Sequence, residues 1–280
     1  MKVKQKGKEV EPMTIIVGII CNDGLVIACD SQASSMKGVP VKRTEYTKIY
    51  DIPMGGDGCA LLSGAGTGAF ITRASELLTD KCKNTVCRTP REFADICEDV
   101  VTEIFKRYVI DKSKALGMTK ARISKEMDGS TQWQEGEVEP PGIVIISGIQ
   151  CGNPKSPDWC LYTIHSNGVA EKSEKYDAIG SGSAIAEYLL ARLCSEESSY
   201  EQSIQVAVYI IEEVKKIDPF CGGPTQVVSL SKNGVKRLAP REVKGIADLV
   251  MEQDENLASF WRSLILETKV IPNNKTEDKS

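Results

Sequence analysis

The sequence predicts an α+β fold in which two mainly antiparallel sheets are covered by helices on their outer sides. Segments of strand and helix character alternate in the order strands, helix pair, strands, helix pair, strands. Turn signals of the Asn-Gly and Asp-Gly type join neighbouring strand segments, and such turns connect antiparallel strands. With 280 residues, of which 41% are apolar, the chain is long enough to bury the core of one large layered domain.

The first part of the chain contains a hairpin and two further strands. Runs rich in Ile and Val flank Asn22-Asp23-Gly24, which is a strong hairpin signal. The polar stretch at residues 31–44 is expected to be a loop or a short strand pair. Strands are therefore expected at residues 15–20, 25–29, 46–52 and 59–62.

Two helices are expected next. The glycine-rich run 63–68 follows a short buried strand and leads into a helix at about residues 69–78. The second helix has Thr89 at its cap and Glu92 three residues later, which is a typical capping pair. Apolar residues then recur at helical spacing to about residue 108, so this helix is expected to bury one face.

The second part of the chain repeats the order of strands followed by helices. Its hairpin signals are Asn167-Gly168 and Lys232-Asn233-Gly234. Strands are expected at residues 142–149, 159–165, 169–172, 176–179, 224–230 and 235–238. Helices are expected at residues 183–193 and 200–217, and a mostly helical stretch at residues 240–268.

Charge and composition argue against several partners. The 35 basic and 39 acidic residues are interspersed and leave a net charge of −4, which favours neither nucleic acid nor anionic lipid. The lysine-rich start is followed by no apolar segment of the kind found in signal peptides or membrane anchors. Residues 112–141 are charged and poor in apolar side chains, so a surface insertion is expected there. The expected location is the cytoplasm.

The ten cysteines are scattered, without a Cys-x-x-Cys pair, and His165 is the only histidine. Zinc and iron–sulfur spacing is therefore absent, and no metal or other cofactor is expected. Without a secretory signal the cysteines are expected to be reduced thiols, several of them small core residues. Extracellular disulfides are the alternative.

Six short motifs occur in order between Thr14 and Leu238. They are Thr14-Ile-Ile-Val-Gly-Ile, Gly24-Leu-Val-Ile-Ala-Cys-Asp30-Ser-Gln-Ala, Tyr46-Thr-Lys48-Ile, Ser63-Gly-Ala-Gly66-Thr, Ile179-Gly-Ser181-Gly-Ser and Asp218-Pro-Phe-Cys221-Gly-Gly. Each motif is weak alone. In this order and spacing, the chain resembles the proteasome β-type subunits and the bacterial proteasome-related peptidases, which are N-terminal-nucleophile hydrolases.

The resemblance implies a four-layer αββα sandwich over residues 14–240, preceded by an extension or propeptide at residues 1–13. It implies a threonine-type endopeptidase that hydrolyses unfolded polypeptides inside a ring assembly. The ring would be a homo-oligomer or a co-assembly with related subunits, and an ATP-driven unfoldase would be a possible supplier of substrate. Residues 241–280 would form a C-terminal, mostly helical extension.

The resemblance also assigns the central catalytic roles. Thr14 would supply the hydroxyl nucleophile and, once residues 1–13 are removed, the α-amine that acts as its base. A free α-amine titrates near ~8, close to the working pH, where a general base is most effective. Lys48 matches the lysine whose charge lies beside the nucleophile, and Asp30 matches the carboxylate that pairs with this lysine.

Four further residues match supporting roles. Gly66 matches the glycine whose backbone N–H faces the developing oxyanion. Ser181 and Asp218 match the pair that hydrogen-bonds around the terminal amine. Cys221 stands where the family usually places a second amine-contacting serine, and sulfur is the weaker hydrogen-bond partner.

The chain departs from the family pattern in other places. Met13 precedes Thr14, whereas self-processing members usually carry glycine there. If translation starts at Met13, removal of the initiator methionine exposes Thr14 directly. The insertion at residues 112–141 and the stretch beyond Pro240 have no counterpart in the compact members.

Other interpretations of the same residues remain open at this point. The chain could be a catalytically silent structural subunit of a proteasome-like ring, with Thr14 blocked behind residues 1–13. Gly64-x-Gly66-x-x-Ala69 fits a loose dinucleotide-binding fingerprint, although no parallel strand with a ribose-binding acid is evident. A serine hydrolase of the α/β type is disfavoured because Gly-x-Ser-x-Gly is absent. The sequence leaves the cleavage preference and the ring size open.

Overall fold

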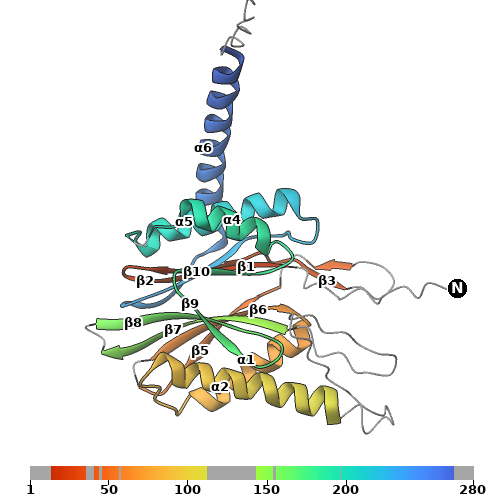
Figure 1. Ribbon diagram of the computed structural model, residues 1–280, viewed down its shortest axis with the longest axis vertical. Helices are drawn as coiled ribbons and strands as arrows, with labels where there is room; N and C mark the ends of the chain where they lie inside the picture. The colour runs from red at the N-terminus through yellow and green to blue at the C-terminus, as the bar shows by residue number, and fades with distance from the viewer. Residues whose placement is uncertain are drawn as a thin grey trace, which may run out of the picture.

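The structure is a computed structural model in which two five-stranded sheets lie face to face between two layers of helices (Figure 1). It describes residues 14–35, 41–43, 46–56, 58–111, 143–153, 156–195 and 197–267. The expected extension at residues 1–13, the insertion at residues 112–141 and residues 268–280 lie outside the described residues. Every strand pairing between described residues is antiparallel, as the hairpin turns predict.

The first sheet, called sheet 1, has the strand order β10-β1-β2-β11-β12. Its strands are β1 (Ile15–Cys21), β2 (Gly24–Cys29), β10 (Tyr176–Gly180), β11 (Gln226–Ser231) and β12 (Gly234–Arg237). The turn between β1 and β2 joins Cys21 to its partner Gly24, so the predicted hairpin is confirmed. A side chain at Gly24 would collide with the backbone oxygen of Leu230, because β11 approaches closely there.

The second sheet, called sheet 2, has the strand order β5-β6-β7-β8-β9. Its strands are β5 (Ile49–Pro53), β6 (Cys59–Gly66), β7 (Ile143–Asn153), β8 (Ser156–Ile164) and β9 (Ala170–Ser173). β6 is longer than predicted because its glycine-rich end, Gly64–Gly66, pairs with Ile143–Ile145 of β7. The polar stretch after Asp30 forms a separate strand pair, β3 (Ala33–Ser35) and β4 (Val41–Arg43).

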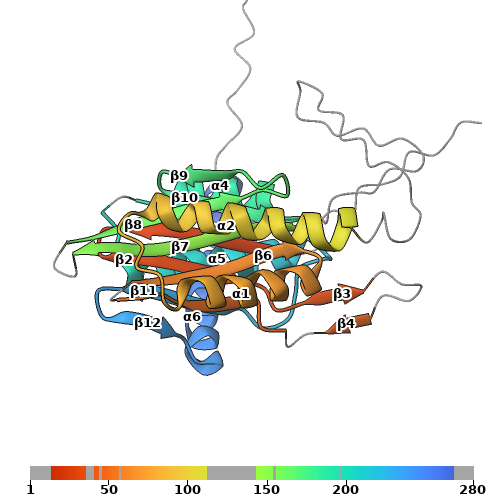
Figure 2. The same cartoon turned by 90° about the horizontal axis from the view of Figure 1, so that it is seen from below.

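Helices cover the outer face of each sheet. α1 (Gly68–Cys82) and α2 (Pro90–Ile104) lie over sheet 2, as Figure 2 shows from below, and α2 continues into the π-helix η1 (Phe105–Ile110). α4 (Ser183–Leu193) and α5 (Tyr200–Ile217) lie over sheet 1. The predicted cap is present at Thr89, whose side chain accepts the backbone N–H of Glu92. α5 begins with a complete capping box between Ser199 and Gln202.

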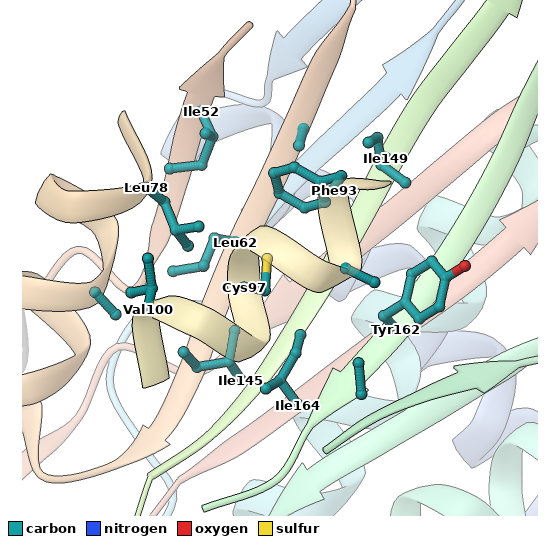
Figure 3. Close-up of a cluster of buried hydrophobic side chains, with 14 of the residues drawn as sticks. Ile52, Leu62, Leu78, Phe93, Cys97, Val100, Ile145, Ile149, Tyr162 and Ile164 are labelled. Carbon is teal, nitrogen blue, oxygen red and sulfur yellow. The ribbon is translucent and has the colours of Figure 1, made fainter. Parts of the chain in front are cut away.

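Separate apolar layers hold the sandwich together. Figure 3 shows the layer between α2 and sheet 2, in which Phe93 and Cys97 of the helix face Leu62 and Ile145 of the sheet. A corresponding layer joins α4 and α5 to sheet 1, and a third fills the space between the two sheets. All ten cysteines are free, and eight of them are buried. Most of the cysteines therefore act as small core residues, as expected.

Two glycines set how closely the sheets approach. A Cβ atom at Gly18 of β1 would lie 2.8 Å from Cδ1 of Leu161 in β8. A Cβ atom at Gly148 of β7 would lie 2.6 Å from Cδ1 of Leu25 in β2. Each sheet therefore offers a glycine where the other inserts a leucine, and the two contacts fix the relative position of the sheets.

The last helix, α6 (Pro240–Glu267), begins against sheet 1 and α5 and then rises away from the layers (Figure 1). The helical stretch expected from residue 240 is thus present as far as the structure describes it. The division of the chain into domains at residue 240 stays a prediction. None of the described helices is long and apolar enough to cross a membrane.

Candidate active site

Thr14 stands at the entrance to β1 and is almost completely buried, with 3% of its surface exposed. The strand that follows it pairs with β2 on one side and β10 on the other. Thr14 therefore lies at an end of the central strand pair of sheet 1. Its side chain is held there by Asp30, which follows β2, and by Lys48, which precedes β5.

Asp30, Lys48 and Thr14 form one buried cluster. The Thr14 hydroxyl donates to Oδ1 of Asp30 at 2.5 Å, and the Lys48 ammonium donates to the same carboxylate oxygen at 2.6 Å. The Lys48 ammonium also donates to the Thr14 hydroxyl oxygen. The Asp30 side chain is fully buried and the Lys48 side chain is 8% exposed. The three residues predicted to form the catalytic centre are thus in direct contact.

Three backbone groups fix the Asp30 carboxylate. Its Oδ2 accepts the backbone N–H of Gly222 at 3.0 Å and that of Gln32 at 3.2 Å. Its Oδ1 accepts the N–H of Ile15 at 3.2 Å. A buried carboxylate with both oxygens satisfied keeps its orientation, so Asp30 holds Lys48 and Thr14 in a defined geometry.

The backbone of Lys48 is held by side chains from both sheets. Oε1 of Gln226 in β11 accepts the N–H of Lys48 at 3.1 Å, and the hydroxyl of Ser63 in β6 donates to its carbonyl at 2.8 Å. The amide nitrogen of Gln226 also donates to the carbonyl of Tyr46 at 2.7 Å. The strand expected from residue 46 begins at Ile49 instead, because side chains take the backbone groups of Lys48.

A second cluster surrounds the main chain of Thr14. The Ser181 hydroxyl donates to Oδ2 of Asp218 at 2.6 Å and lies 3.4 Å from the Thr14 carbonyl oxygen, which it approaches as a donor. The Cys221 thiol lies 3.3 Å from the same Asp218 oxygen and 3.8 Å from the Ser181 hydroxyl. Ser181, Asp218 and Cys221 therefore meet beside Thr14, as the motifs predict.

The Cys221 thiol is suited to a passive role. Burial raises its pKa well above the ordinary value, and the neighbouring Asp30 and Asp218 raise it further. The side chain is only 5% exposed. A neutral, buried thiol is a poor nucleophile, so Cys221 fills space and orients its neighbours.

Gly180 lets β10 approach Thr14. Its φ is +107°, and a Cβ atom there would lie 2.1 Å from the Thr14 carbonyl oxygen. No side chain fits at this distance. Gly180 stands inside one of the motifs, but neither its conformation nor this contact is visible in the sequence.

Gly66 ends β6 with a φ of +113° and is exposed. No hydrogen bond links it to Thr14 in the described part of the chain. Its expected role towards an oxyanion stays a prediction. The dinucleotide-binding alternative is not supported here, since that site needs parallel strands, whereas β6 runs antiparallel to both β5 and β7.

Comparison with known proteins finds proteasome β-type subunits that are similar to this chain over most of its length. The chain is 25% identical over 236 residues to the proteasome subunit beta of Methanocaldococcus sp. strain FS406-22, covering 84% of this chain and 89% of that protein. It is 27% identical over 228 residues to the proteasome subunit beta 1 of Thermococcus gammatolerans, covering 81% of this chain and 94% of that protein. No family model matches the chain.

Solved structures agree in fold. Anbu, an ancestral β-subunit from Yersinia bercovieri, superposes with a TM-score of 0.64 at 15% identity, over 92% of this chain and 99% of that one. Anbu from Pseudomonas aeruginosa, in a structure described as a helical assembly, gives a TM-score of 0.65 at 15% identity, over 93% and 99% of the two chains.

The chain is related to the proteasome β-type subunits. Its two antiparallel sheets and flanking helices are the N-terminal-nucleophile hydrolase fold of the proteasome-type proteins. The motif resemblance is therefore confirmed in sequence and in fold. Sequence reasoning missed Gln226 and Ser63, because a side chain that holds a distant backbone group leaves no local pattern.

Proposed function

We propose that this protein is a threonine-type endopeptidase of the proteasome kind, with Thr14 as its nucleophile after removal of residues 1–13. The observation that carries the proposal is the contact of the Lys48 ammonium with both the Thr14 hydroxyl and the Asp30 carboxylate inside a buried site. A lysine held in this way beside a hydroxyl stabilises the alkoxide that forms when the hydroxyl loses its proton.

The reaction follows from the groups around Thr14. The free α-amine takes the proton of the hydroxyl, and the oxygen attacks the carbonyl carbon of the scissile peptide bond. The tetrahedral intermediate collapses to an ester on Thr14 when the leaving amine receives the proton. The same amine then activates a water molecule that hydrolyses the ester.

The remaining site residues support this chemistry. Lys48 lowers the energy of the negative oxygen, and Asp30 keeps Lys48 in place. Ser181 and Asp218, which lie beside the main chain of Thr14, orient the amine once it is free. The backbone N–H of Gly66 stabilises the oxyanion, an interaction typically worth about 10²–10³ in rate.

The same resemblance supports the proposed setting. The substrates are unfolded polypeptides, and the subunits form a ring of like or related chains in the cytoplasm with the sites facing an inner chamber. An ATP-driven unfoldase delivers the substrate. Support for an assembly comes from the relatives, which are named proteasome subunits, and from the helical assembly described for one Anbu structure.

The second candidate is a catalytically silent structural subunit. It is favoured by one observation, since Met13 precedes Thr14 and a Thr14 nitrogen in a peptide bond cannot act as a base. Against it stands the buried cluster, because a silent subunit gains nothing from a lysine held against the Thr14 hydroxyl.

Two chains that differ only at the N-terminus test the proposal. One begins at Thr14 and the other keeps residues 1–13, and turnover of an unstructured peptide is measured for both. The chain beginning at Thr14 should be active, its Thr14→Ala variant should lose at least about 10³ of the rate, and Thr14→Ser should retain part of it. Equal turnover by Thr14→Ala and the parent would contradict the mechanism. Complete inactivity of the chain beginning at Thr14 would favour the silent subunit.

A further inference from the structure

α6 is half attached to the body and half free of it. Val243, in its first turn, is 3% exposed, and Ile246, Ala247 and Val250 pack partly against the core of sheet 1 and α5. The attachment continues to Asp254, whose carboxylate accepts the hydroxyl of Tyr209 in α5 at 2.9 Å. Beyond that contact the helix continues for three more turns.

The face that attaches α6 to the body continues unchanged into the free half. Successive steps of four and three residues follow this face, which is the spacing of a helix–helix seam. The seam consists of Val243, Ala247, Val250, Asp254, Leu257, Trp261 and Leu264. Its first part packs against the protein's own body, and Leu257 and Trp261 in its last part are more than half exposed.

The free half of the seam is apolar and uncharged. The exposed fractions are 54% for Leu257, 53% for Trp261, 41% for Leu264, 58% for the flanking Phe260 and 68% for the flanking Ile265. The charged residues between positions 255 and 266 are Glu255 and Arg262. They form an ion pair with each other at 2.8 Å, and the only other charged residue of α6 beyond Glu255 is Glu267 at its end.

We propose that the free half of α6 binds the same helix of a second copy of this chain. A contact between two identical surfaces has to be self-complementary, and an uncharged apolar seam meets this requirement. Burying roughly 100 Å² of each of the five side chains removes about 500 Å² per copy, or ~1,000 Å² in total, from water, which reaches the size expected of a specific interface. The proposal rests on the proposed self-assembly and is independent of the proposed chemistry.

The test compares two triple variants of the full-length protein. Leu257→Lys, Trp261→Lys and Leu264→Lys together place three charges on the seam. Ser259→Lys, Ser263→Lys and Leu266→Lys place the same three charges on the side of the same turns that faces away from the seam. Mass in solution is measured over a hundredfold range of concentration by light scattering and sedimentation, and circular dichroism reports folding.

The parent and the opposite-face variant should show the same assembled mass, and the seam variant should fall to a smaller species while it stays folded. A seam variant with the parent's mass would overturn the proposal, and so would a parent that is monomeric throughout. A chain ending at residue 255 lacks the free half of α6. If this chain still joins the assemblies of the parent, the seam of the parent binds a surface other than α6, which would also contradict the proposal. A chain ending at Glu267 should assemble like the parent, because residues 268–280 are not the proposed occupant.

Peptide turnover is read in the same samples. A protein that assembles through the seam but cleaves no peptide would contradict the proposed function alone. A protein that cleaves peptide but assembles without the seam would contradict the interface alone.

Discussion

The side-chain oxygen of Gln226 accepts the backbone N–H of Lys48 at 3.1 Å, although 178 residues separate the two in the sequence. Gln226 begins β11 in sheet 1, and Lys48 immediately precedes β5 in sheet 2. The contact ties the lysine of the candidate site to the sheet that carries Thr14. The distance between the nucleophile and its cation therefore depends on a side chain outside the buried cluster.

Replacing Gln226 with Leu should lower kcat about tenfold while KM stays close to that of the parent. The substitution leaves the Lys48 N–H and the Tyr46 carbonyl without their partner, so Lys48 can shift against Thr14. Steady-state kinetics of peptide cleavage over a pH series give kcat, KM and the pH profile. Gln202→Leu is the matched control, since it removes the capping-box bond of α5 and destabilises the fold by about 1 kcal/mol without touching Lys48. If both variants lose the same activity, Gln226 has only a structural role.

Gly180→Ala should destabilise the protein by more than about 3 kcal/mol. Alanine is strained at the positive φ of this position, which costs about 1 kcal/mol. Its methyl group would also collide with the Thr14 carbonyl oxygen. Gly234→Ala supplies the control because Gly234 also has a positive φ, of +91°, but has no atom within 4 Å of the added Cβ. Urea unfolding measures the unfolding free energy of both variants. If the two variants lose the same amount, the close approach of Gly180 to Thr14 carries no cost.

Gly148→Ala should cost roughly 1–3 kcal/mol of unfolding free energy, because its Cβ meets Leu25 of the opposite sheet. Shortening Leu25 to Val in the same chain should recover part of this loss. Gly245→Ala, on the exposed side of α6, should instead stabilise the helix by up to about 1 kcal/mol. Denaturant titrations of the four proteins decide this, and a Gly148→Ala variant as stable as the parent would mean that the sheets can separate locally.

The unfolding free energy should fall as the pH rises above about 9. Burial raises the pKa of the Cys29 thiol to about 12 and those of Cys21 and Cys59 to about 11. In the unfolded chain these thiols ionise near ~8.5. Between these values the unfolded state has lost protons that the folded state keeps, so each such thiol lowers stability by up to about 1.4 kcal/mol per pH unit.

Unfolding titrations from pH 8 to 10.5 measure this slope. Cys29→Ala should show a shallower slope than the parent, whatever its stability at pH 8, since one titrating thiol has been removed. A slope unchanged by the substitution would show that Cys29 does not keep its proton in the folded state.

Local sequence signals predicted the parts of the fold that depend on neighbouring residues. Asn22-Asp23-Gly24 fixes a tight turn, and this turn alone brings Asp30 back beside Ile15 and hence beside Thr14. Thr89 and Glu92 predicted a helix start for the same reason, because a cap acts within one turn of the chain.

Contacts between distant segments could not be predicted in this way. The N–H of Gly222 reaches Asp30 across 192 residues, and Gln226 reaches Lys48 across 178. Neither residue differs locally from any other glycine or glutamine in a loop or strand. The contact between Thr14, Asp30 and Lys48 was predicted only from a resemblance. In the structure, the physical cause of this contact is the stacking of the two sheets.

The free half of α6 shows a different limit. The spacing of apolar residues predicted the helix, but it could not predict at which residue α6 leaves sheet 1 and α5. Leu257 and Val250 look alike in the sequence, yet one is 54% exposed and the other packs against the core.

The central claim is that a free Thr14 amine makes this protein a peptidase. The most direct measurement is the intact mass and N-terminal sequence of the purified protein, taken from the same assembled fraction that is assayed for peptide cleavage. Active fractions should contain chains that begin at Thr14, with activity proportional to their share. Full activity in a fraction whose chains all begin at Met1 would contradict the account, because the Thr14 nitrogen would then be part of a peptide bond.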